Sequence, residues 1–115
     1  MRIAITGGRD HKPTKDEVRK FLVLVKELGM TECHHGAAPG VDSYIAKVCD
    51  NKGYKTVAHK ANWDLYGPSA GPIRNMETMA ASEALIAFPG GKGTMGTIRI
   101  AVDSEKPVYK LWEIQ

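Results

Sequence analysis

Short runs of apolar and β-branched residues alternate with segments of helical periodicity along the whole chain. Five of these runs have the length and composition of buried β-strands. They cover residues 3–6, 31–35, 54–59, 84–88 and 107–112. Strict alternation of strand and helix requires right-handed crossovers, which produce a mostly parallel sheet with helices on both faces. The alternation therefore predicts a three-layer, doubly wound α/β fold.

Four segments between the strands carry apolar residues at helical spacing. The first helix is expected to start at Thr14, where Glu17 completes a capping box, and to stop at Gly29. Gly53 is expected to close the second helix, and Pro72 lies in the first turn of the third. The predicted buried faces are Val18, Phe21, Leu22, Val25 and Leu28 in the first helix, Val41, Ile45 and Val48 in the second, Ile73, Met76 and Ala80 in the third, and Met95, Ile98 and Val102 in the fourth.

Length, charge and cysteine content exclude several classes of protein. With 115 residues the chain has the size of one domain, expected to span residues 1–115. Lys and Arg are scattered and the net charge is only +3, which argues against duplex DNA as a partner. No run approaches the roughly 20 apolar residues of a membrane span, and the first residues do not resemble a secretory signal. Because Cys33 and Cys49 form no CxxC pair, we expect reduced thiols and a cytoplasmic protein.

Glycine-rich turns follow three of the predicted strands. In a doubly wound sheet, ligands bind beyond the carboxyl ends of the strands, where the strand order reverses. If the first and fourth strands are central neighbours, their turns face each other at that point. The turn residues are Gly7, Gly8 and Arg9 after the first strand, Gly36, Gly40 and Asp42 after the second, and Pro89, Gly90, Gly91, Lys92, Gly93 and Thr94 after the fourth. The three turns predict one cleft at this edge of the sheet.

Residues 89–94, here called the glycine loop, have the sequence Pro-Gly-Gly-Lys-Gly-Thr. Glycine lets the backbone approach a ligand closely, and free N–H groups together with the helix dipole attract an anion such as phosphate. Pro89 fixes the entry to the loop, and Thr94 is expected to cap the following helix. The alternative is a tight connection without a ligand.

Two nucleotide-binding motifs are absent or misplaced. A GxGxxG pattern starts at Gly91, but it lies in the last strand–helix–strand unit, so no second dinucleotide-binding half follows. No GxxxxGK[ST] sequence occurs. We therefore expect neither NAD nor any other cofactor.

Polar and aromatic side chains near the predicted cleft are candidates for contacts with the ligand. Arg74 can form paired hydrogen bonds to phosphate or carboxylate, and Asn75 can donate to a ribose or a base, although both also suit a solvated first turn. Asp42 is a general base, an acceptor for ribose hydroxyls, or a partner of the helix dipole. Trp63 and Tyr66 offer a stacking face for a base, or they anchor their loop on the core.

The sequence gives weaker support for a functional role of the other charged, cysteine and histidine residues near the turns. Arg9 and Asp10 contact the ligand or form a local ion pair. Cys33, His34 and His35 are consecutive in a strand and point to alternating faces, so they cannot converge on one metal ion, and no metal site is expected. His35, at the end of the strand, remains a candidate general acid or base.

The chain resembles the small YspA-type branch of the SLOG superfamily nearly from end to end. The matching residues are Thr6-Gly7-Gly8-Arg9-Asp10, His35-Gly36-Ala37 with Gly40 and Asp42, Asn62-Trp63, Gly67 with Ala70-Gly71-Pro72, Arg74-Asn75, and Ala87-Phe88 with the glycine loop. The superfamily includes the Lonely Guy phosphoribohydrolases and the Rossmann-like domain of DprA. The resemblance implies a Rossmann-like fold, a nucleotide or nucleotide-derived ligand, and a homo-oligomer of two or more chains.

One position departs from the pattern of the enzymes in this superfamily. Their glycine loop reads PGGxGTxxE, and its Glu works with an Arg from the preceding helix, whereas Thr97 occupies the Glu position here. A Thr hydroxyl does not stabilise a developing cation or accept a proton at neutral pH. If Arg74 matches the family's Arg, only Asp42 or Glu77 is left to supply the acid.

We therefore expect a module that senses or sequesters a phosphorylated nucleotide-like ligand, in conflict between a phage or plasmid and its host. The alternative is a nucleoside 5′-monophosphate N-glycosidase that uses Arg74 and Asp42. A weaker alternative is single-stranded DNA binding, as in DprA.

Overall fold

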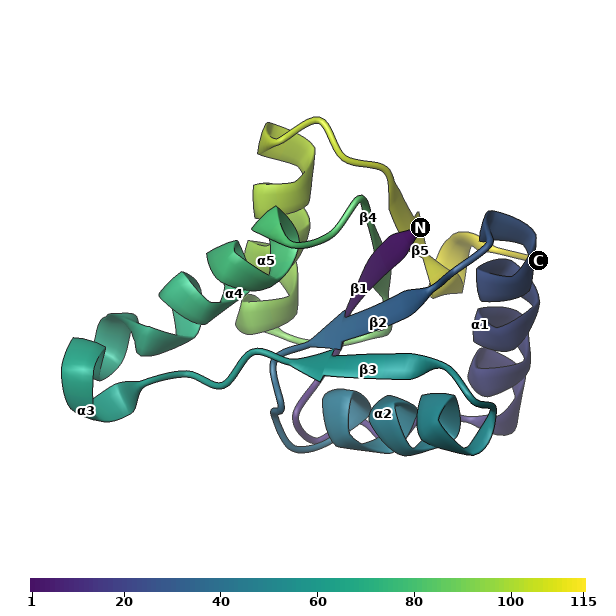
Figure 1. Cartoon of the computed structure of the whole chain (residues 1–115), viewed down its shortest axis with the longest axis horizontal. Helices are drawn as coiled ribbons and strands as arrows, with labels where there is room; N and C mark the ends of the chain where they lie inside the picture. The colour runs from purple at the N-terminus through teal and green to yellow at the C-terminus, as the bar shows by residue number, and fades with distance from the viewer.

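A wholly parallel five-stranded sheet forms the middle layer of the computed structural model, which describes residues 1–115 (Figure 1). The strands are β1 (Arg2–Thr6), β2 (Glu32–His35), β3 (Lys55–Ala58), β4 (Ala84–Ala87) and β5 (Val108–Lys110). Their order is β3-β2-β1-β4-β5, so β1 and β4 are the central neighbours. In that pair Ile3 lies opposite Ala84 and Thr6 opposite Ala87, and both strands end at the same edge of the sheet. The predicted α/β class, strands and switch point are confirmed.

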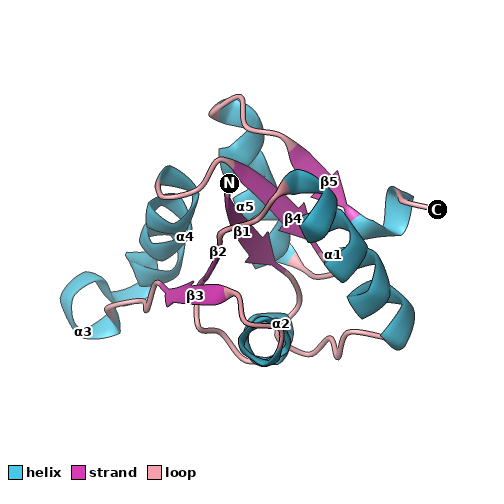
Figure 2. Ribbon diagram, turned by 45° about the vertical axis from the view of Figure 1, so that its right-hand side comes forward, coloured by secondary structure: helices cyan, strands magenta, loops and turns pink.

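Helices cover both faces of the sheet (Figure 2). On one face lie α1 (Lys15–Leu28) and α2 (Val41–Asn51), and on the other lie α4 (Ala70–Ala80) and α5 (Lys92–Asp103). Short helical turns complete the chain: α3 (Trp63–Tyr66), η1 (Gly67–Ser69) and η2 (Leu111–Glu113). No helix is both long enough and apolar enough to span a membrane.

Helix α1 begins and ends where its sequence predicts. The Thr14 side chain accepts from the Glu17 N–H, and the Glu17 carboxylate accepts from the Thr14 N–H. Gly29 closes the helix in the left-handed conformation, with φ of 69°. Both ends therefore satisfy backbone groups that the helix itself leaves unpaired.

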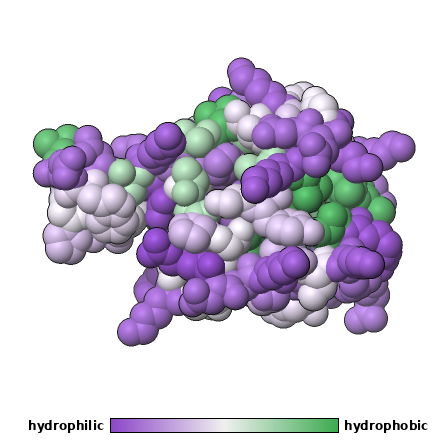
Figure 3. Space-filling view, turned by 90° about the horizontal axis from the view of Figure 1, so that it is seen from below, coloured by the Kyte–Doolittle hydropathy of each residue, from purple (hydrophilic) through white to green (hydrophobic).

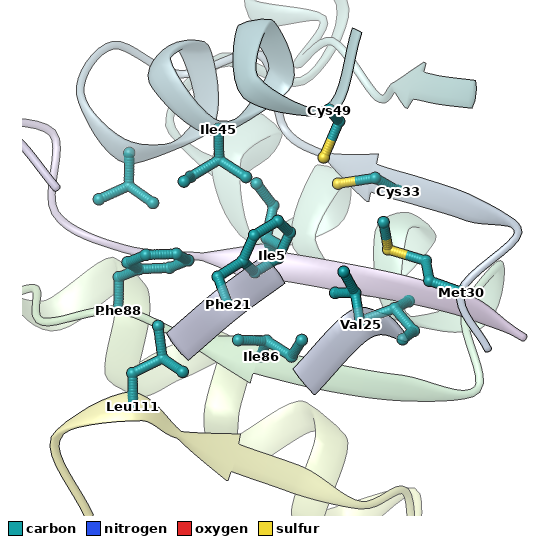
Figure 4. Packing of buried hydrophobic residues seen from close by; sticks show 12 residues of the cluster. Ile5, Phe21, Val25, Met30, Cys33, Ile45, Cys49, Ile86, Phe88 and Leu111 are labelled. Atoms are coloured by element: carbon teal, nitrogen blue, oxygen red, sulfur yellow. The ribbon is translucent and has the colours of Figure 1, made fainter. Parts of the chain in front are cut away.

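The larger core lies between the sheet and the helices α1 and α2 (Figure 4). Phe21 of α1 and Phe88 beyond β4 meet in its centre, with ring centroids 5.7 Å apart. The sulfur atoms of Cys33 and Cys49 point toward each other in this core, and both thiols are free. Twelve buried residues make up the cluster, and they come from strands and helices along nearly the whole chain.

The core under α4 and α5 is smaller, and three of its six residues are alanines. The predicted buried faces of these two helices are wrong for Ala80, which is exposed, and for Met76, Met95 and Val102, which are 53%, 54% and 59% exposed. The faces that do pack inward carry Thr78 and Met79 in α4, and Thr94, Thr97, Ile98 and Ala101 in α5. Three of the large apolar side chains on these helices are therefore exposed.

Residues 63–69, here called the arm, form α3 and η1 and project from the body of the molecule (Figures 1 and 3). The sequence predicts a loop here, but the Asn62 side chain caps a helical turn by accepting from the Leu65 N–H. Helix α4 then begins at Ala70. This earlier start places Arg74 and Asn75 in the second turn of the helix and not in the first.

Candidate functional site

A cleft of about 980 Å³ opens at the edge of the sheet where β1 and β4 end. Its walls are the turns after β1, β2 and β4, the inner sides of α4 and α5, and Trp63 of the arm. The predicted site residues that line it are Gly7, Gly8, Arg9, Gly36, Asp42, Arg74, Asn75, Pro89, Gly90, Gly91, Lys92, Gly93 and Thr94. The structure thus brings the three glycine turns to one place.

Backbone hydrogen bonds hold the three turns against one another. The Gly8 N–H donates to the Pro89 carbonyl at 2.8 Å, and the Gly8 carbonyl accepts from the Val41 N–H at 3.2 Å. A methyl group at Gly90 would lie 2.6 Å from Gly8 N and 2.1 Å from Thr94 Oγ1. Gly90 is therefore needed for close packing between the turns.

Gly40 was predicted to contact the ligand, but it lies outside the cleft wall. Its φ of 79° favours glycine, and a methyl group there would lie 2.3 Å from the Gly8 carbonyl oxygen. Its role is to let the turn before α2 approach the turn after β1.

The start of α5 presents unpaired backbone donors to the cleft. Gly91 is the residue before the helix, and no side chain caps this end. The N–H groups of Lys92, Gly93 and Thr94 have no partner within the helix because they belong to its first turn. A methyl group at Gly91 or Gly93 would meet no atom within 4 Å, so space is open beside these donors.

Thr94 does not cap α5 as predicted, because it is the third residue of the helix. Its side chain is 3% exposed and lines the cleft beside Gly90. The hydroxyls of Thr78 and Thr97 donate to the carbonyls of Arg74 and Gly93, whereas the Thr94 hydroxyl forms no hydrogen bond. An unpaired hydroxyl therefore lies next to the free N–H groups.

Asp42 shapes the turn between β2 and α2. Its Oδ2 accepts from the Gly36 N–H at 2.9 Å and from the Ala38 N–H at 3.3 Å. Burial raises the pKa of Asp42, although these two N–H groups and the charge of Arg74 oppose the rise. The carboxylate lines the cleft, but one of its oxygens is occupied by the backbone.

Arg74 connects α4 to the same turn. One terminal nitrogen, Nη1, donates to the Gly36 carbonyl at 2.5 Å, and Nε donates to Asn75 Oδ1 at 2.9 Å. The other terminal nitrogen, Nη2, has no hydrogen-bond partner in the chain. Arg74 is thus fixed at the cleft wall with one donor group left for a ligand.

Neither Thr97, at the position of the family's Glu, nor the candidate acid Glu77 brings a carboxylate into the cleft. Thr97, at the Glu position of the related enzymes, is 3% exposed, and its hydroxyl is bonded to the Gly93 carbonyl. Glu77 is exposed and lies outside the cleft, in a small hollow beside the arm that Tyr66 and Arg74 also line. The cleft therefore lacks a carboxylate at either position.

Neither histidine of β2 lines the cleft. His34 Nδ1 lies 2.8 Å from His59 Nε2, and its Nε2 lies 2.9 Å from Glu32 Oε1. His35 Nδ1 accepts from the Ala37 N–H at 3.0 Å. Burial and the neighbouring charge of His59 lower the pKa of His35. The candidate role of His35 as an acid or base finds no support in its position.

Sequence reasoning missed several residues of the cleft wall. They include Thr6, His11, Met76, Thr78 and Ile100. His11 was within reach of prediction, because it follows Arg9 and Asp10 in the turn after β1. Thr78 carries no such signal, because a Thr in a helix usually indicates surface.

Comparison with known proteins shows that the chain is similar in sequence to a phage protein. No protein-family model matches the chain. The chain is 30% identical to the "Gene 61 protein" of Mycobacterium phage D29 over 119 aligned positions, which cover 93% of each protein. At this identity and coverage, the chain belongs to the same family as that phage protein.

Proposed function

We propose that the protein binds a phosphorylated nucleotide or nucleotide-derived molecule in the cleft and acts as a sensor or sequestering module. The observation that carries this proposal is the uncapped start of α5. Three free N–H groups, the positive end of the helix dipole and the unpaired Thr94 hydroxyl meet there beside open space. Lys92 and Arg9 add positive charge to the same wall. A terminal phosphate satisfies this set of donors.

The rest of the cleft suits a nucleoside. Its volume of about 980 Å³ lies at the upper end of the usual range for small-molecule sites. Met76 and Ile100 give it an apolar stretch, and Trp63 adds an aromatic ring whose edge lies against Gly71 of α4. Asn75 and the free nitrogen of Arg74 are available for the sugar or base.

Binding without cleavage is favoured over the N-glycosidase alternative. Cleavage requires a carboxylate next to the sugar, and Thr97 supplies none. Asp42 is the one carboxylate of the cleft that lies near Arg74, and its Oδ2 is occupied by Gly36 and Ala38. The residues for binding are present, while the residues for catalysis are incomplete.

Membership of the SLOG superfamily and a role in phage–host or plasmid–host conflict belong to the same proposal. The resemblance of the glycine turns supports the first, and the family relation to a mycobacteriophage protein supports the second. A protein of this kind acts in the host cytoplasm.

We also propose that the protein is a homo-oligomer. Met95 and Val102 are exposed on α5, and Leu65 and Tyr66 are exposed on the arm. Apolar side chains on both sides of a helix are typical of helices covered by a partner. Size-exclusion chromatography with light scattering tests this, and a monomer at 100 µM would contradict it.

Native mass spectrometry of protein purified without denaturation tests the binding proposal directly. We expect a bound mass that fits a nucleotide-derived phosphate. A thermal-shift panel of nucleoside monophosphates against their nucleosides gives a second test, since a ligand at 100 times its Kd stabilises the fold by about 2.7 kcal/mol. Stabilisation by nucleosides and monophosphates alike would contradict the role of the glycine loop.

The alternatives give different results in the same assays. Chromatography after incubation with AMP or IMP detects free base and ribose 5-phosphate if the protein is an N-glycosidase. Tight binding of an oligonucleotide at physiological salt, unaffected by Arg74→Ala, would favour single-stranded DNA binding.

A further inference from the structure

His11 and Glu17 form a hydrogen-bonded pair at the wall of the cleft. His11 Nε2 lies 2.7 Å from Glu17 Oε1, and the side chains are 28% and 16% exposed. The same carboxylate oxygen accepts from the Thr14 N–H at 2.9 Å as part of the cap of α1. The His11 N–H donates to the Gly8 carbonyl at 3.3 Å, which fixes His11 to the turn after β1. The pair thus joins the start of α1 to the cleft.

This arrangement determines which ring nitrogen of His11 is free. Burial alone raises the pKa of Glu17, but the hydrogen bonds from Thr14 and His11 lower it overall, so Glu17 is ionised at neutral pH. An ionised carboxylate only accepts hydrogen bonds, so Nε2 of His11 carries a proton and donates it. Nδ1 is then the ring atom left for a ligand, and it becomes a donor only when the imidazole is protonated.

The other charged groups of the cleft wall are Arg9, Asp10, Asp42, Arg74 and Lys92. Arg and Lys side chains are already cations with donors only, so they gain no donor by binding a proton. Asp42, whose pKa is raised by burial, accepts from the Gly36 and Ala38 N–H groups. His11 is the only imidazole of the wall, and an imidazole gains a second N–H donor when it binds a proton.

We propose that His11, held by Glu17, is a proton-dependent contact for the phosphate of the ligand. Binding of the phosphate favours the imidazolium form, whose Nδ1–H donates to a phosphate oxygen. One proton passes from solvent to Nδ1, and no covalent bond forms or breaks. This proposal rests on the proposed function, because it concerns the same ligand. It makes Glu17 a positioning residue and His11 a binding residue.

Calorimetric titration with 5′-AMP tests the proposal at pH 7.0 in two buffers of different ionisation enthalpy. Wild-type protein is expected to take up a fraction of one proton on binding. His11→Gln keeps a hydrogen-bonding group near Glu17 but cannot titrate, so its proton uptake disappears. His59→Gln is the matched control, because His59 titrates outside the cleft and its loss leaves the uptake unchanged.

The pH profile sharpens the same experiment. Between pH 8.5 and 6.5, above the second pKa of about 6 of a phosphate monoester, the affinity of the wild type rises as the pH falls. The affinity of His11→Gln stays flat and is about tenfold weaker at pH 6.5, the loss of one charge-assisted hydrogen bond. Glu17→Gln moves the rise in affinity to lower pH, because the carboxylate no longer stabilises the imidazolium.

The possible results separate the two proposals. Binding of 5′-AMP without proton uptake, or with equal uptake in His11→Gln, overturns the role of His11 and leaves the proposed function standing. Failure of the wild type to bind any nucleoside monophosphate between pH 6.5 and 8.5 overturns both. Normal unfolding curves for the variants confirm that their folds are intact.

Discussion

The two faces of the sheet differ in how they are packed. They also differ in how well the sequence predicts which residues of the covering helices are buried. The face under α1 and α2 holds twelve buried residues, with Phe21 and Phe88 in contact at the centre. The face under α4 and α5 holds six, three of them alanines, and opens into the cleft. One face is closed by large side chains, while the other leaves room for a ligand.

This difference shows a division of work between the faces. Burial of large apolar side chains supplies most of the stability of a small domain, so we assign stability chiefly to the face of α1 and α2. The other face bears the glycine loop and Arg74, and there we propose ligand binding. Substitutions on the two faces should therefore have different consequences.

The largest expected effect on stability comes from Phe21→Ala. Removing a fully buried ring from the larger core should lower the free energy of unfolding by about 3–5 kcal/mol. The matched change on the other face, Met76→Ala, removes a half-exposed side chain and should cost the monomer under about 0.5 kcal/mol. Urea denaturation of both variants measures the difference, and equal losses would contradict the division of work.

Asp42 gives a second test of how the cleft is built. Asp42→Ala leaves the N–H groups of Gly36 and Ala38 without their acceptor, so we expect a loss of about 1–3 kcal/mol in the free energy of unfolding. Asp42→Asn keeps an oxygen acceptor and removes the buried charge, so its loss should be smaller. If Asn and Ala at this position are equally destabilising, the hydrogen bonds to the turn are not what Asp42 contributes.

Gly93→Ala should separate stability from binding on the cleft side. A methyl group there meets no atom within 4 Å, and Ala is favoured over Gly in a helix by up to about 1 kcal/mol. The same methyl group occupies space that a phosphate needs beside the N–H groups of α5. We expect a higher melting temperature together with weaker binding of 5′-AMP, and little change in the binding of adenosine. Unchanged affinity for 5′-AMP would place the phosphate elsewhere.

The His34–His59 pair predicts a smaller effect, which depends on pH. Burial and the charge of His34 lower the pKa of His59 in the fold, although the charge of Glu77 opposes this. The unfolded chain, with a histidine pKa of about 6.5, therefore binds the proton more readily. Stability is fully present above this pH and falls as the pH drops through it. Denaturation at several pH values should give a shallower fall for His59→Asn than for the wild type, and identical slopes would refute the assignment.

The sequence predicts much of the fold because its signals there are local. The capping box of Thr14 and Glu17, the stop at Gly29 and the apolar strands each depend on neighbouring residues only. The meeting of the glycine turns follows from the alternation of strands and helices, and the structure confirms that β1 and β4 are neighbours.

The packing of α4 and α5 was not predictable in the same way. Thr78 and Thr97 are buried because each hydroxyl donates to the carbonyl four residues earlier, which satisfies it without an outside partner. The buried faces of α4 and α5 therefore contain polar residues in the sequence, whereas the exposed Met76 and Met95 have the composition expected of core residues. The pair of His11 and Glu17 was missed because the contact crosses the loop between β1 and α1.

The most direct test of the central claim is the change in backbone amide NMR signals when 5′-AMP or adenosine is added. If the start of α5 holds the phosphate, 5′-AMP should shift the amides of Lys92, Gly93 and Thr94 most strongly, and adenosine should leave them nearly unchanged. Equal shifts with both compounds, or the largest shifts outside the cleft, would contradict the claim.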